Sequence, residues 1–88
     1  MKLNNEFVLR QVADTWVVLA LGSASIDFSG MLTLNESGAI LWRALEHGAD
    51  REMLVDALTA EYDVDRDVAT QDVDAFLTKL AKAGCLEM

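Results

Sequence analysis

Proline is absent from this chain, and cysteine and histidine occur once each, as Cys85 and His47. A lone cysteine cannot form a disulfide within the chain, which favours a reducing compartment. Catalysis needs converging groups with tuned pKa values, yet Cys85 has no histidine near it in sequence, and His47 lies at a predicted helix end. The pattern predicts a protein that is not an enzyme.

Cysteine and histidine, the usual ligands of zinc, are equally scarce. One cysteine and one histidine fall short of the four N or S ligands of a structural zinc site. Asp63, Asp65 and Asp67 alternate as in a calcium loop. Val68 and Asp74 stand where that loop requires glycine and glutamate. We therefore expect no metal and no other cofactor.

Basic residues are few: seven against 15 acidic ones, for a net charge of −8. Residues 50–88 hold most of this excess, with ten of the acids and four of the bases. An acidic surface repels phosphate groups, so nucleic acid is not an expected partner. The same surface suits a basic partner, or serves solubility alone.

Long apolar runs are missing as well. The longest, residues 16–21, is far too short to span a bilayer, and residues 1–6 lack the apolar run of a signal peptide. We expect a cytoplasmic protein with no membrane partner. The 88 residues suit one domain, residues 1–88, and a hydrophobic content of 52% indicates a folded one.

The first third of the chain predicts strands. Residues 7–12 and 15–21 are rich in β-forming side chains, and the short stretch between them can turn, which indicates a hairpin. After a second loop, residues 31–34 predict a third strand, with a bulge or bend at Gly30.

From residue 35 the apolar period changes from 2 to 3.6. Asn35, Asp50 and Asp65 are good N-caps, and Gly48 and Gly84 are typical helix stops. The pattern predicts three helices, at about residues 36–47, 50–62 and 66–83.

Three strands followed by three helices indicate an α+β domain, in which a three-stranded antiparallel sheet packs against a helical layer. Because the third strand enters a helix directly through Asn35, its free edge should lie beside helical side chains. That arrangement predicts a groove with unpaired backbone on one wall.

Two segments of the chain resemble the PqqD family. They are Leu-Asn-x-x-Gly-Ala-x-x-Trp at residues 34–42 and Asp-Val-x-x-Phe-Leu at residues 72–77. The resemblance extends from about residue 7 to residue 87. It implies a winged-helix-like fold and a peptide partner, the leader segment of a ribosomally made precursor. It also implies presentation of that leader to a modifying enzyme, often a radical SAM enzyme. In this family the leader adds as a strand beside the third strand and leans on the third helix.

On the third strand the resemblance places the peptide-binding edge at Gly30, Met31, Leu32, Thr33 and Leu34. Gly30 has no Cβ and allows close approach of a peptide. Alternation directs Leu32 and Leu34 to one face of the strand, and Met31 and Thr33 to the other. Met31 serves either as an adaptable peptide contact or as ordinary core.

On the third helix, a stripe beside the apolar one consists of Val68, Asp72, Ala75, Lys79 and Lys82. The small Ala75 should leave a shallow depression edged by Phe76. An apolar side chain of a peptide would fit there, with charges paired at either end. The other interpretation is an ordinary solvated helix face.

Two other functions stay open at this point, a winged-helix DNA-binding regulator and a structural accessory subunit without a peptide ligand. The former would need a basic recognition helix, which the acidic second half of the chain does not favour. The oligomeric state is open between a monomer and a weak dimer, since a bare strand edge can pair with itself.

Overall fold

The structure is a computed structural model that describes residues 2–22 and 32–87. Gly30 and Met31, where the third strand was predicted to begin, lie outside the described residues. The elements in chain order are β1 (Lys2–Leu3), β2 (Phe7–Val12), β3 (Thr15–Ala20), β4 (Leu32–Leu34), α2 (Glu36–Glu46), α3 (Arg51–Glu61), α4 (Arg66–Ala83) and β5 (Leu86–Glu87). The predicted order of a three-stranded antiparallel sheet followed by three helices is confirmed.

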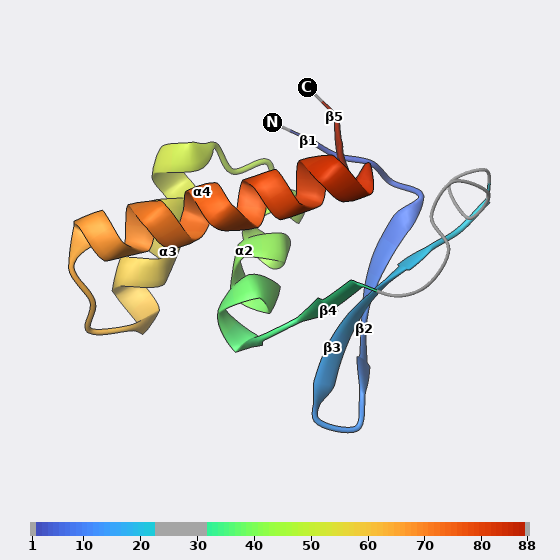
Figure 1. Cartoon of the computed structure of the whole chain (residues 1–88), viewed down its shortest axis with the longest axis horizontal. Helices are drawn as coiled ribbons and strands as arrows, with labels where there is room; N and C mark the ends of the chain where they lie inside the picture. The colour runs from blue at the N-terminus through green and yellow to red at the C-terminus, as the bar shows by residue number, and fades with distance from the viewer. Residues whose placement is uncertain (1, 23–31, 88) are drawn as a thin grey trace.

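The sheet has the strand order β2-β3-β4, so that β4 is an edge strand within the described part of the chain. A two-residue turn at Ala13 and Asp14 joins β2 to β3, with Ala13 at φ 56°. The long hairpin of β2 and β3 extends away from the helices, and β4 leads from it into α2 (Figure 1).

The turn decides which way each backbone group of the sheet points. In a hairpin with a two-residue turn, the closing pair, here Val12 and Thr15, is hydrogen-bonded. Hydrogen-bonded and non-hydrogen-bonded pairs then alternate, so the pair of Arg10 and Val17 is hydrogen-bonded. The N–H and C=O of Val17 therefore both point to β2. Val17 lies opposite Thr33 of β4. Thr33 therefore directs both of its own backbone groups away from β3, to the free edge.

Each of the three helices begins at the expected polar residue, but only two of these residues form a side-chain cap. Asn35 Oδ1 accepts a hydrogen bond from Gly38 N–H at 2.8 Å, and Asp50 Oδ1 accepts one from Met53 N–H at 2.9 Å. Asp65 occupies the N-cap position of α4 without a side-chain hydrogen bond to the helix. At the other end, Gly84 closes α4 in the left-handed region, at φ 81°.

The helices pack around one hydrophobic core. Leu41 and Trp42 of α2, Leu54 of α3 and Leu80 of α4 are among its most buried side chains. Val18 joins them from the central strand, so the core lies between the sheet and the helices. The indole Nε1 of Trp42 has no hydrogen-bond partner among the described residues. Because its side chain is 0% exposed, Trp42 is a core residue.

Ion pairs on the surface link α3 to α4. Arg51 donates two hydrogen bonds to Asp74, at 2.7 and 2.8 Å, and these hold the pKa of Asp74 below its ordinary value. Arg66 reaches back to Glu52 and Asp56 of α3. Exposed pairs of this kind stabilise a fold only slightly, so the packing of α3 against α4 rests mainly on their buried side chains.

A short ribbon, which the sequence did not predict, ties the two ends together. Lys2 and Leu3 of β1 pair with Leu86 and Glu87 of β5 in an antiparallel sheet. Asn4 N–H also donates to the carbonyl of Cys85 at 2.7 Å. The termini therefore lie side by side at the end of α4 (Figure 1).

The caps give a matched test of local stability. Replacing Asp50 by Ala should lower the free energy of unfolding by about 1 kcal/mol, because a helix donor loses its partner. Replacing Asp65 by Ala should lower the free energy of unfolding by only about 0.3 kcal/mol, since Asp65 contributes charge near a helix N-terminus and no side-chain hydrogen bond. Urea unfolding of both variants measures the difference. Equal losses would contradict the assigned caps.

Candidate functional site

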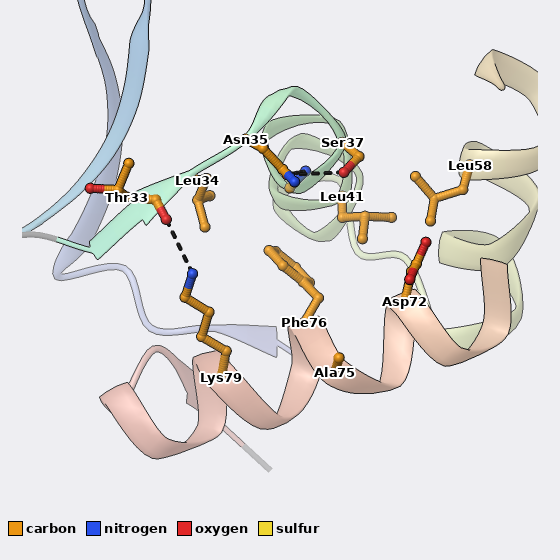
Figure 2. Close-up of a pocket in the computed structure, with 11 residues that line it drawn as sticks. Thr33, Leu34, Asn35, Ser37, Leu41, Leu58, Asp72, Ala75, Phe76 and Lys79 are labelled. Carbon is orange, nitrogen blue, oxygen red and sulfur yellow. Dashed lines mark hydrogen bonds between the residues drawn. The ribbon is translucent and has the colours of Figure 1, made fainter. Parts of the chain in front are cut away.

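A groove of about 480 Å³ lies between β4, the first turn of α2 and the exposed side of α4. Figure 2 shows β4 and α2 on one side of it and α4 on the other. Its lining residues are Thr33, Leu34, Asn35, Ser37, Gly38, Leu41, Leu58, Asp72, Ala75, Phe76 and Lys79.

The β4 wall carries the free backbone edge. Thr33 is exposed, whereas Leu34 turns its side chain into the core. The ammonium of Lys79, from α4, donates a hydrogen bond to the Thr33 carbonyl oxygen at 3.2 Å (Figure 2). This contact agrees with the direction that the hairpin register assigns to Thr33. A side chain, and no strand among the described residues, thus satisfies the edge carbonyl.

The second part of the wall is the start of α2. Asn35 Oδ1 accepts hydrogen bonds from both Gly38 N–H and the Ser37 hydroxyl, which directs the Asn35 side chain onto the helix end. A Cβ at Gly38 would lie 3.2 Å from both Leu34 Cβ and Asn35 Oδ1. Glycine therefore allows the first turn of α2 to sit close to the end of β4.

The α4 wall combines a buried and an exposed set of side chains. The ring of Phe76 is directed towards α2 and is 8% exposed, so it belongs both to the core and to the groove floor (Figure 2). Ala75, next to it, is exposed and small. Asp72 and Lys79 flank Ala75 on the same helix, with opposite charges. The wall is thus apolar at its centre and charged at both ends.

Six of the residues predicted for the site line this groove together: Thr33, Leu34, Asp72, Ala75, Phe76 and Lys79. Leu32 is half-buried in the sheet and does not line it. Val68 is 46% exposed but lies outside the groove, one turn of α4 before Asp72. Gly30 and Met31 fall outside the described residues.

Several lining residues were not predicted as site residues. Asn35 is predicted only as an N-cap, a role that it does fill, and Ser37 and Gly38 follow it in the first turn of α2. Leu41 and Leu58 belong to apolar helix stripes, and their periodicity indicates core. Periodicity cannot show that one end of a core side chain opens onto a groove.

The groups most apt for chemistry lie elsewhere. Cys85 is fully buried, and burial raises the pKa of its thiol to about 11. His47 is exposed at the end of α2, where its Nδ1 lies 2.8 Å from the carbonyl oxygen of Arg43. Within the described ranges, no three His, Cys, Asp or Glu side chains gather as a metal site. None of the helices in these ranges combines the length and apolarity needed to cross a membrane.

Comparison with known proteins gives a family and two solved structures. The family model of coenzyme PQQ synthesis protein D (PqqD) matches residues 15–86. A search of curated proteins finds no match. One similar structure is TbiB1 in complex with the TbiA(beta) leader peptide. It has a TM-score of 0.81 and 34% sequence identity, and the alignment covers 99% of this chain and 95% of that one.

The other similar structure is lasso peptide synthetase B1 complexed with the leader peptide. Its TM-score is 0.76 at 27% identity, over 96% of this chain and 93% of that one. Both alignments cover nearly the whole of each chain, so the likeness extends over β4 and α4.

Proposed function

The chain belongs to the PqqD family, and on that premise we propose that it binds the leader segment of a ribosomally made precursor peptide. The leader adds as a strand to the free edge of β4, leans on α4, and is presented to a modifying enzyme. The observation that carries the proposal is the outward-facing backbone of Thr33 above a groove of about 480 Å³. Two structural relatives bear leader peptides, which supports the same class of ligand.

Strand addition fits the groups available at this edge. A peptide strand would lie about 4.8 Å from β4 and exchange main-chain hydrogen bonds with Thr33. The Thr33 carbonyl is at present bonded to Lys79, so a peptide N–H would take over that bond. The released ammonium then lies beside the peptide, where an acidic side chain or a peptide carbonyl can pair with it. The Lys79 ammonium thus donates to the Thr33 carbonyl oxygen in the position that a peptide N–H would take.

The α4 wall supplies the selectivity for side chains. The exposed Ala75 leaves room for one apolar side chain of the peptide, which would contact Phe76. Of the predicted contacts, Gly30, Met31, Leu32 and Val68 stay in the proposal only as flanking positions. The core of the site is the set of six residues that line the groove.

We assign the chain a binding role and no catalytic one. The thiol of Cys85 is buried and resists ionisation. The exposed imidazole of His47 lies against the carbonyl oxygen of Arg43, and no set of metal ligands gathers within the described residues. Chemistry on the peptide then belongs to a separate enzyme. That this enzyme is of the radical SAM type, and that both act in the cytoplasm, are predictions.

DNA binding is the less favoured function, because three cations of the helical layer are already engaged. Arg51 pairs with Asp74, Arg66 pairs with two acids of α3, and Lys79 bonds to β4. Few positive charges remain on a helical layer rich in exposed acids, and phosphate contacts depend on such charges.

The edge is tested by replacing Thr33 with Pro. Proline removes the outward N–H and leaves the bonds of Leu32 and Leu34 to β3 in place, so affinity for the leader should fall at least roughly tenfold. The probes are synthetic peptides that cover any short open reading frame found beside the gene of this chain, titrated by calorimetry.

Thr33→Val serves as the matched control, since it keeps the N–H and the β-branched shape. Its affinity should stay within about twofold of the parent chain. Circular dichroism checks that the proline variant is folded. Unchanged affinity in a folded Thr33→Pro variant would exclude strand addition at this edge.

The α4 wall is tested separately by replacing Ala75 with Trp. The indole would fill the centre of the groove and should weaken binding by on the order of tenfold. Ala81→Trp, on the same helix and also exposed, lies outside the groove and should bind as the parent chain does. If the two variants bind equally well, the peptide does not contact the α4 wall.

A further inference from the structure

The groove continues past Asp72 into a second hollow of about 350 Å³. The two hollows share Asn35, Ser37, Leu58 and Asp72 in their linings. The second one adds Glu36, Tyr62 and Val64. A peptide that lies along β4 can therefore run on into this hollow without leaving the groove.

The second hollow has an apolar floor. Leu58 is buried, Tyr62 is half-buried, and Val64 stays 40% exposed although it is a large aliphatic side chain. Val64 stands in the connection between α3 and α4, so it contributes exposed apolar surface beside the two helices. This surface suits the aliphatic or planar part of a long side chain.

Its rim is negative. Glu36 at the start of α2 and Asp72 on α4 both line the hollow, and no cation lines it with them. Within the described residues, neither carboxylate takes part in an ion pair, unlike Glu52, Asp56 and Asp74 nearby. The pKa of Tyr62 is raised, mainly because partial burial disfavours its charged form and to a smaller extent because Glu36 and Glu61 are negative. Glu36 lines the same hollow as Tyr62, so a negative charge stands beside the floor.

We propose that this second hollow, called here the acidic subsite, binds one Lys or Arg side chain of the leader peptide. The alkyl stem lies on Leu58, Tyr62 and Val64, and the charged head pairs with Glu36 and Asp72. The face of Tyr62 adds attraction for a cation. This inference rests on the proposed leader binding and names one residue class that the leader must contain.

The position of the basic residue follows from the course of β4. The strand runs from Leu32 to Leu34 and then enters α2 next to the acidic subsite. The basic residue must therefore flank the segment that pairs with β4, at the Leu34 end. In a peptide antiparallel to β4 it precedes the paired segment, and in a parallel one it follows that segment.

A displayed library of random 12-residue peptides, selected on the intact chain, tests the proposal without knowledge of the natural leader. Recovered peptides should carry Lys or Arg at one constant distance from an apolar residue. The recovered peptides are then synthesised, together with versions that have norleucine in place of the basic residue. Norleucine should weaken binding to the parent chain by roughly tenfold, as expected for a charge-assisted pair.

The variant Glu36→Gln with Asp72→Asn isolates the subsite. It should bind the basic and the norleucine peptides with affinities that differ by less than about twofold. Glu46→Gln with Asp67→Asn is the matched control, because it removes the same two charges from the same two helices outside the groove and its second hollow. That control should keep the tenfold preference.

The outcomes separate the subsite from the leader binding on which it rests. If recovered peptides lose affinity on Thr33→Pro but show no basic preference, the acidic subsite is wrong and strand addition stands. If the basic preference survives Glu36→Gln with Asp72→Asn, the subsite is likewise wrong. If no peptide is recovered, or if the recovered peptides bind the Thr33→Pro variant as tightly as the parent chain, the proposed function fails together with the subsite.

Discussion

The binding groove depends on which backbone groups of the central strand are already used. The two-residue turn at Ala13 and Asp14 determines which pairs of β2 and β3 are hydrogen-bonded. The register of β3 with β4 then determines which residues of β4 bond to the sheet. As a result Thr33 faces outward with its N–H and C=O, and its neighbours face the sheet.

The second requirement is that α4 stay close to that edge without closing over it. Phe76 and Leu80 fix one face of α4 in the core. Lys79 then reaches Thr33 through a long side chain, where a shorter residue would leave the carbonyl to water. The same helix thus stabilises the fold with one face and offers a peptide wall with the next.

The sequence predicts much of this from local patterns. The change of apolar period near Asn35 locates the helices, and the stripe of Asp72, Ala75 and Lys79 locates the α4 wall. The groove floor was missed because Leu41 and Leu58 have the spacing of core residues, and only tertiary packing decides which core residue borders a gap. The β1–β5 ribbon was missed because a two-residue strand has too few residues for any periodicity.

Two further differences have the same origin. Asp65 stands in a good N-cap position, yet whether its carboxylate turns back to the helix depends on its rotamer and not on the residue type. Val68 shares the helical stripe with Asp72 but does not line the groove, and helical spacing identifies a face of α4 without showing which turns of that face have an opposing wall. The family resemblance supplied the kind of ligand, which no local pattern in the chain specifies.

Amide hydrogen exchange at Thr33, read by NMR with and without the leader peptide, tests the central claim most directly. The Thr33 amide should exchange readily in the free chain and at least roughly tenfold more slowly in the saturated complex, because the peptide strand accepts its hydrogen bond. The Leu34 amide, already bonded to β3, should change little. An unprotected Thr33 amide in a saturated complex would contradict strand addition at β4.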